Sequence, residues 1–302
     1  MTLDAPLLDG TAATDGAAAS SRRSPWRTAL RRFLRHKAAV VSSVVLLIIV
    51  VGAVFAPWIA GHDPNAIDLT AHNAPPSAAH WLGTDSTGRD ELARLLYGGR
   101  ISLGVGLASA AFAVVIGTLL GSLAGLLGGW LDSFVMRLAD IFMSFPSLVV
   151  IVVIAGIIGP SVTTMVVGIG LFQWPVCGRL VRGATLSLRE QEFVHAARAT
   201  GAGPYWLMTR HIIPAALPPV SVVATLAVAQ AIGLEATLSF LGLGVQPPSA
   251  SWGNMLTDAQ DLTIVRTEWW LWLPPALAVA VTVLAVNFIG DGLRDAVDPR
   301  QS

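Results

Sequence analysis

The sequence predicts an all-α membrane protein in which six helices cross the bilayer. Composition gives the first indication, because 54% of the 302 residues are hydrophobic and only 13% are charged, whereas a typical soluble domain has about 25% charged residues. The second indication is a series of uncharged runs, each as long as the about 20 residues that a helix needs to cross a membrane. Together these observations indicate a protein that lies in the bilayer.

A basic amino-terminal segment precedes the first apolar run. Residues 1–21 are rich in Ala, Ser, Thr and Asp without periodicity, and residues 22–37 hold seven Lys and Arg side chains. Such a polar segment has too little apolar surface to bury. We therefore expect a disordered and basic cytoplasmic tail over 1–37, followed by the first span over 38–60. The run is longer than the about 7–15 apolar residues of a signal peptide.

The remaining apolar regions supply the other five spans. They cover residues 101–131, 141–178, 212–234 and 269–290. The second region is too long for a single span, and a Gly-Pro-Ser sequence at 159–161 predicts a turn that divides it into two helices. The first of these helices should begin near Met136. We thus expect an extracytoplasmic loop at 61–100, a core with five spans over 101–292 and a cytoplasmic tail at 293–302.

Positive charge predicts the orientation of the bundle. With the amino terminus inside, fifteen of the nineteen Lys and Arg residues lie in inside segments and four lie in outside segments. Cytoplasmic loops carry the excess of positive charge in membrane proteins, so we predict that both termini are cytoplasmic. Two long loops, 59–100 and 236–268, then face outside, and one long loop, 179–214, faces the cytoplasm.

Several classes of chemistry are excluded by missing residues. Cys177 is the only cysteine, so neither an intrachain disulfide nor a thiolate metal cluster can form. Lys37 is the only lysine and lacks the glycine-rich surroundings of a phosphate-binding loop, so any ATP hydrolysis must come from a partner. The six histidines show no ligand-spaced cluster, and no nucleophile–base pair is present. We therefore expect no metal site and no enzyme.

The cytoplasmic loop contains a helix–turn–helix pattern. Residues 190–200 suit a helix with acids in its first turn, Gly201 suits the left-handed position after a helix end, and Pro204 suits the start of a second helix. Small alanines at positions 196, 197 and 199 would let another backbone approach closely. The pattern fits either an amphipathic helix on the bilayer surface or a helix that docks into a partner protein. A helix–turn–helix that recognises DNA is disfavoured, because membrane spans flank the loop on both sides.

In this loop the chain resembles the permeases of ATP-binding-cassette (ABC) importers. Their loop carries Glu-Ala-Ala, three residues, Gly, nine residues and Ile-x-Leu-Pro, and this chain keeps the spacing. The matching residues are His195, Ala196, Ala197, Gly201, His211, Ile213 and Pro214. His195 replaces Glu, His211 replaces Ile, and Ile213 replaces Leu. The resemblance implies that the loop holds a short coupling helix that sits in a cleft of the ATPase subunit.

Two further motifs resemble the C-type permeases of dipeptide and oligopeptide importers. One covers residues 82–90 and 98–103, and the other covers residues 235–244, 247–248 and 251–253. The resemblance implies a type I ABC-importer permease bundle in the bacterial inner (plasma) membrane. It also implies four kinds of partner: a second, B-type permease, two ABC ATPases that use ATP and Mg²⁺, an extracytoplasmic substrate-binding protein, and the lipid bilayer. This chain itself would bind no cofactor and no nucleic acid.

The first of these motifs predicts a short capped helix outside the membrane. Its charged residues are Asp85, Arg89, Asp90, Arg94 and Arg100. Thr87 is placed to cap the helix, with Asp90 three residues further on, and Asp90 and Arg94 form an i, i+4 pair. Gly98 would end the helix. Such a helix would orient the second span, or it would provide a contact surface for the partner permease or the binding protein.

Four polar side chains lie within the predicted spans or at their ends. They are Gln173, Gln230, Glu235 and Asn287. Polar groups inside a bilayer are costly and often functional. Either these groups hydrogen-bond between helices, or they line the translocation path and its gate. Glu235 is expected at the outer end of the fifth span.

The expected function is translocation of di- or oligopeptides by alternating access. A binding protein would deliver the peptide, and partner ATPases would supply the energy. The same motifs would also suit importers of nickel chelates, glutathione or heme. An ion-driven secondary transporter is an alternative of another class, but it predicts charged groups in mid-span, and the spans carry charge only at their boundaries.

Overall fold

The computed structural model describes residues 25–297, and the predicted disordered segment 1–21 lies outside this range. All regular elements of the described residues are helices, and five of them are long and apolar enough to cross a membrane. Three of these are α2 (Lys37–Val54), α4 (Glu91–Leu127) and α7 (Val162–Arg189). The fourth is the helical segment Pro204–Phe240, most of which is α10 (Ile213–Phe240), and the fifth is α13 (Trp269–Val297), whose apolar span ends at Ala296. A sixth span arises if α5 (Gly129–Ser144) and α6 (Ser147–Ile158), bent by 85° at their junction, are taken as one.

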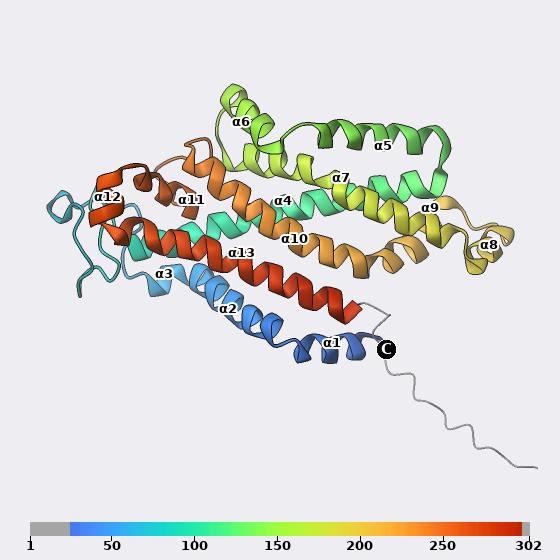
Figure 1. Cartoon of the computed structure of the whole chain (residues 1–302), viewed down its shortest axis with the longest axis horizontal. Helices are drawn as coiled ribbons and strands as arrows, with labels where there is room; N and C mark the ends of the chain where they lie inside the picture. Colours follow the sequence, from blue (N-terminus) through green and yellow to red (C-terminus); the bar gives the residue numbers. More distant parts are fainter. Residues whose placement is uncertain (1–24, 298–302) are drawn as a thin grey trace, which may run out of the picture.

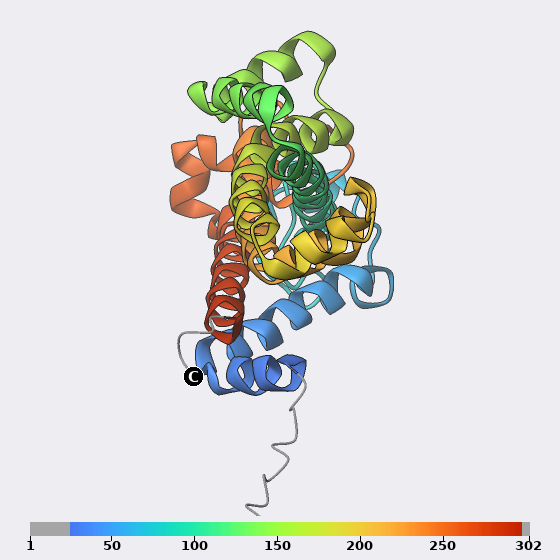
Figure 2. The ribbon, with the colours of Figure 1, turned by 90° about the vertical axis from the view of Figure 1, so that its right-hand side faces the viewer.

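The long helices run side by side along the long axis of the molecule (Figure 1). Short elements gather at both ends of the bundle. One end carries α3 (Ala56–Ile59), η1 (Leu69–Ala71), α11 (Trp252–Met255), η3 (Leu256–Gln260) and α12 (Leu262–Thr267), and the other carries α8 (Glu192–Ala199), α9 (Pro204–Leu207) and η2 (Met208–Ile212). Viewed along the bundle, α5 and α6 form a layer on one side, and α1 (Pro25–Arg35) and α2 lie on the opposite side (Figure 2).

Glycines on α4 allow α7 to pack closely against it. Gly117, Gly121 and Gly125 recur every fourth residue and face α7. A Cβ atom added at Gly117 would lie 2.7 Å from the carbonyl oxygen of Trp174, and one at Gly121 would overlap the carbonyl oxygen of Gly178. Such small-xxx-small patterns bring helix backbones together in membranes, where van der Waals packing replaces the hydrophobic effect. The α4–α7 pair therefore forms the centre of the bundle.

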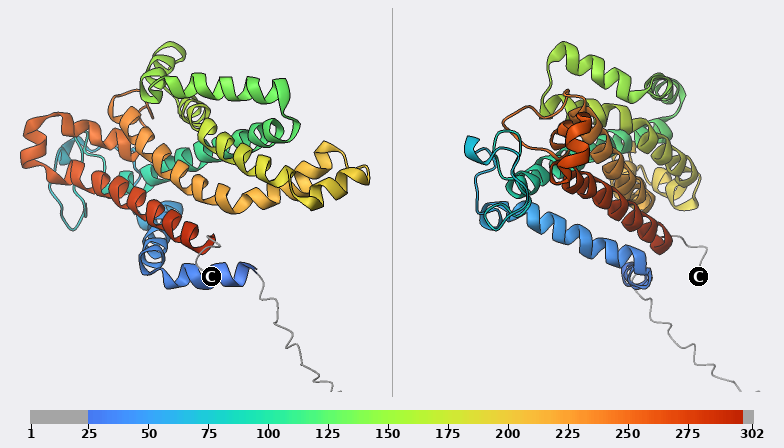
Figure 3. Two further views of the ribbon diagram at one scale, coloured as in Figure 1. Left: turned by 45° about the vertical axis from the view of Figure 1, so that its right-hand side comes forward. Right: turned by 60° about the vertical axis from the view of Figure 1, so that its left-hand side comes forward.

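The basic segment before the first span is helical, contrary to the prediction of a disordered tail over all of 1–37. Helix α1 covers Pro25–Arg35, and it turns away from the axis of α2 (Figure 3). The ring of Phe33 packs beside Gly292 of α13. The composition argument for disorder rested on residues 1–21, whereas α1 lies in the basic part of the tail, where an amphipathic helix can bury its apolar face on a neighbouring helix.

Helix α2 ends at Val54, earlier than the predicted end at residue 60, and α3 follows it. Arg100 fixes this end, because its Nε and Nη2 donate to the carbonyl oxygens of Ala53 (2.8 Å) and Val54 (2.9 Å). A basic side chain satisfies the free carbonyls of a helix end and complements its dipole. Arg100 therefore links the first span to the second.

The predicted short helix that ends at Gly98 is not formed. Helix α4 begins at Glu91 and runs without interruption through Gly98, so the preceding loop ends at Asp90 rather than at residue 100. Asp90 caps the helix in place of Thr87, with its Oδ1 accepting the Ala93 N–H at 2.7 Å. Gly98 serves close packing, since a Cβ there would lie 3.3 Å from the backbone of Ser251.

The predicted break at 159–161 is confirmed. Helix α6 ends at Ile158, and α7 begins at Val162 after the capping residue Ser161. A further break at Phe145-Pro146 separates α5 from α6, because proline disfavours a helical conformation in the residue before it.

Three other boundaries differ from the prediction. Helix α5 begins at Gly129 rather than near Met136, α7 continues to Arg189 and so removes residues 179–189 from the predicted loop, and α13 extends to Val297, into the predicted tail.

Candidate functional site

The predicted coupling residues lie in and directly after a helical hairpin, α8 and α9, at one end of the bundle (Figures 1 and 2). The turn between the helices is a Schellman motif. The Gly201 N–H donates to the carbonyl oxygen of Arg198, and the Ala202 N–H donates to that of Ala197, both at 3.0 Å. Gly201 has a φ angle of 89°. The predicted left-handed residue and the helix–turn–helix pattern are therefore confirmed.

An apolar cluster attaches this hairpin to the ends of α4 and α10. Its buried members are Leu126, Val194, Leu207, Met208 and Ile212, with Ala197, Ala202 and Ile213 partly buried against them. Ala197 thus faces the chain's own interior, whereas His195, Ala196 and Ala199 are exposed. The exposed side chains of α8 are therefore mostly small or polar, with Phe193 as an exposed aromatic residue on the same helix.

His211 packs between two aromatic side chains of the hairpin. Its ring centroid lies 5.5 Å from that of Phe193 on α8 and 4.9 Å from that of Trp206 on α9. The planar imidazole fills this gap and connects both helices to η2. Pro214 follows in the first turn of α10, directly after η2.

Asp85 organises the loop at the opposite end of the bundle. Its Oδ1 accepts the Thr87 N–H and hydroxyl, both at 2.8 Å, and the Arg89 N–H at 3.0 Å, while Oδ2 accepts Arg89 Nε at 2.6 Å. Arg94 Nε lies 3.6 Å from the same Oδ2. Arg94 therefore faces Asp85 rather than Asp90, and the predicted Asp90–Arg94 pair is not formed among the described ion pairs.

The pKa of Asp85 reflects two opposing effects. Burial alone would raise it, but the hydrogen bonds from Arg89 and Thr87 together hold the pKa below its ordinary value. The stabilisation is therefore complete above about pH 4, the ordinary range for aspartate. It is lost as the pH falls through the lower pKa of the folded state.

Replacing Asp85 with Asn is expected to loosen this loop at neutral pH. The amide NH₂ would face the Arg89 guanidinium, donor against donor, and the charge-assisted bond would be lost, at a cost of about 2 kcal/mol. Hydrogen exchange of residues 85–90 should then become roughly thirtyfold faster at pH 7. Asp63→Asn, at an exposed position of the same loop, should leave the exchange unchanged. Equal protection in both variants would contradict the role of Asp85.

The four polar side chains of the predicted path are not brought together. Gln230 is exposed, Asn287 is half-buried, and neither amide atom of Gln173 has a hydrogen-bond partner within residues 25–297. Glu235 is fully buried inside α10 rather than at its end. Their assignment to a translocation path remains a prediction.

Glu235 instead lies at the junction of α4, α10 and α11. Its Oε1 accepts the Ser239 hydroxyl at 2.8 Å, and the hydroxyls of Ser102 and Ser251 also face it. Ser102 in turn accepts the Trp252 N–H at 3.1 Å. This polar cluster fixes α11 onto the two long helices.

Comparisons with known proteins agree on one family. The family described as "Binding-protein-dependent transport system inner membrane component" matches residues 117–302, and the N-terminal transmembrane domain of oligopeptide transport permease C matches residues 24–76. A Brucella suis protein named as a peptide permease is 46% identical over 285 residues, which cover 94% of each chain. DdpC of Escherichia coli, named as a D,D-dipeptide transport system permease, is 43% identical over 261 residues, 86% of this chain and 87% of its own.

A solved structure shares the fold. A chain of the MetNI methionine ABC transporter in an inward-facing conformation matches with a TM-score of 0.54 and 22% identity. The match covers 68% of this chain and 96% of the other.

Proposed function

Because this chain belongs to the family of inner membrane components of binding-protein-dependent transport systems, we propose that it translocates di- or oligopeptides as one permease of an ABC importer. An extracytoplasmic binding protein delivers the peptide, a B-type permease completes the path, and two ATPases supply energy from ATP and Mg²⁺. The chain lies in the bacterial inner membrane with both termini in the cytoplasm. The names of its relatives, peptide and dipeptide permeases, support this cargo class.

The surface of α8 supports the coupling step of this proposal. Small exposed side chains at Ala196 and Ala199 let a partner backbone approach, and the Schellman turn holds α8 in a defined orientation. The apolar cluster around Val194 and Leu126 joins α8 to α4 and α10. A partner that displaces α8 therefore also displaces these two spans.

The opposite ends of the same two spans meet again around Glu235. There α4 and α10 hold α11 through Ser102, Ser239 and the buried carboxyl. Because α4 and α10 are continuous helices between the two clusters, a movement at the hairpin reaches the loops at the far end. This continuity is the physical basis that we propose for alternating access.

The proposal is tested by isolating the complex. The chain, its second permease and both ATPases should co-purify in detergent, and peptide-loaded binding protein should raise the rate of ATP hydrolysis at least several-fold. Loading the binding protein in turn with peptide, nickel chelate, glutathione or heme identifies the cargo, because only the true cargo should be taken up by proteoliposomes. Purification of this chain without any ATPase would overturn the proposal and favour an ion-driven transporter.

A further inference from the structure

Three ligating side chains meet at the end of the bundle where α4 begins. His80 Nδ1 lies 2.9 Å and His62 Nδ1 lies 3.8 Å from Asp90 Oδ2, and the three candidate ligand atoms all lie within 4.8 Å of one another. The two imidazole rings are neighbours, with centroids 5.1 Å apart. The spacing of the histidines along the sequence does not reveal this group, because the fold brings the three side chains together.

The spacing of these atoms suits a small divalent ion. Zinc binds nitrogen at about 2.0–2.1 Å and carboxylate oxygen at about 2.0–2.2 Å, so its tetrahedral ligands lie about 3.3 Å apart. The distances from the aspartate oxygen, 2.9 and 3.8 Å, fall on either side of that value. Imidazole ligands select zinc-like transition metals over Mg²⁺ and Ca²⁺, which prefer oxygen.

The local structure holds the ligands ready. Asp90 is only 4% exposed, and its second oxygen is held by the Ala93 N–H, which is the kind of outer contact that orients metal ligands. The backbone of His80 is fixed on both sides by Ser77, because His80 N–H donates to the Ser77 hydroxyl and Ser77 N–H donates to the His80 carbonyl.

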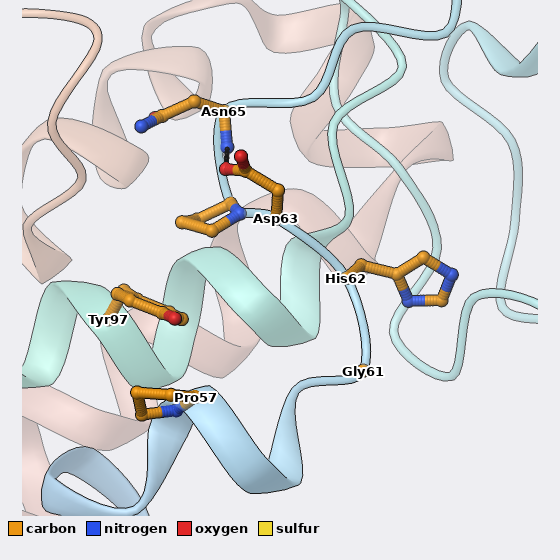
Figure 4. Close-up of a pocket in the computed structure, with 7 residues that line it drawn as sticks. Pro57, Gly61, His62, Asp63, Asn65 and Tyr97 are labelled. Carbon is orange, nitrogen blue, oxygen red and sulfur yellow. Dashed lines mark hydrogen bonds between the residues drawn. The ribbon is translucent and has the colours of Figure 1, made fainter.

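His62 leaves one side of the cluster open. Its side chain is 48% exposed, against 20% for His80. A cavity of about 450 Å³ lies beside it, lined also by Pro57, Asp63, Asn65 and Tyr97. His62 is one of the residues that line this cavity, and Figure 4 shows its ring pointing away from Tyr97 and Asn65. An ion could therefore enter from solvent and keep a water as its fourth ligand.

We propose that His62, His80 and Asp90 bind one zinc-class divalent cation, which fastens the segment after α3 to the first turn of α4. The ion closes a loop between residues that are far apart in the sequence but adjacent in the fold. It stabilises residues 62–90, the loop that also contains the Asp85 cluster. The site is independent of the cargo, because none of the three residues belongs to the hairpin or the polar groups of the predicted path.

Metal binding is measured on the full-length chain, purified without a polyhistidine tag and stripped with a chelator. We expect one Zn²⁺ per chain by elemental analysis, and a visible Co²⁺ absorption of the intensity typical of tetrahedral sites. His62→Ala and Asp90→Asn should each weaken the affinity at least tenfold. Asn caps a helix as well as Asp does, so Asp90→Asn removes the ligand while keeping the start of α4.

His72→Ala is the matched control. His72 lies in the same loop, where its Nδ1 is 2.7 Å from the Ser86 carbonyl oxygen, and it stands outside the cluster. This variant should bind Zn²⁺ like the unmodified chain. Zn²⁺ should also slow hydrogen exchange of residues 62–90 in the unmodified chain and in His72→Ala, but not in His62→Ala. The proposed site would be overturned if the unmodified chain bound no Zn²⁺, or if all variants bound Zn²⁺ with the same affinity.

Discussion

Replacing Gly121 with Ala is expected to force α4 and α7 apart and to deplete the folded protein from the membrane. The added methyl group would overlap the carbonyl oxygen of Gly178, and it would lie 3.1 Å from the backbone nitrogen of Arg182. Backbone atoms inside a helix cannot rotate away as a side chain can, so the cost should reach about 3 kcal/mol, the upper part of the range for overpacking. Thermal unfolding in detergent and the amount of protein in isolated membranes measure the effect.

Gly104→Ala is the matched control for this substitution. Gly104 lies on the same helix, but a Cβ there meets nothing within 4 Å. Alanine should therefore be neutral or stabilise α4 by up to about 1 kcal/mol through its higher helix propensity. Similar unfolding temperatures for the two variants would show that α4 and α7 do not pack through their backbones.

Replacing Gly201 with Val is expected to uncouple ATP hydrolysis from transport while the protein still inserts into the membrane. The φ angle of 89° costs an L-residue about 1–2 kcal/mol, and a β-branched side chain is among the least tolerant of it. The Schellman turn should therefore rearrange and reorient α8 relative to α9. We expect transport to fall at least tenfold in proteoliposomes of the complete complex, with normal membrane levels of the variant.

Gly203→Val separates backbone conformation from side-chain size. Gly203 has an extended backbone with φ −74°, and neither glycine has any atom within 4 Å of an added Cβ. Valine at 203 should therefore preserve transport. If both variants transported normally, the fixed orientation of α8 would have no part in coupling.

The apolar spans could be predicted from the sequence, because a bilayer demands long uncharged runs. The start of α4 could not. Arg94 was interpreted as a residue of a short helix outside the membrane that pairs with Asp90, yet it is buried next to Asp85 in the first turn of α4. Gly98 was predicted to end a helix, whereas in the structure it allows α4 to pack closely against the backbone of Ser251. The local sequence shows that a glycine is present, but its role becomes clear only from the segment of the chain that packs against it.

The hairpin could be predicted because its turn is a local structure, whereas the start of α4 depends on contacts with distant residues. The backbone preferences of Gly201 and Pro204 predict a left-handed cap and the start of a helix. The inward direction of Ala197 and the aromatic neighbours of His211 depend on packing. The proximity of His62 to His80 and Asp90 likewise depends on the path of a whole loop, and no spacing rule reveals it.

Crosslinking from position 196 is the most direct test of the proposed docking of α8 on an ATPase subunit. Cys177 is the only native cysteine and is buried, so a photoreactive maleimide should label Ala196→Cys selectively. In the assembled complex, this label is predicted to crosslink to an ATPase subunit, while a label at the exposed Thr237, near the far end of α10, should not. Absence of an ATPase crosslink from position 196, or an equal yield from both positions, would contradict the proposed docking.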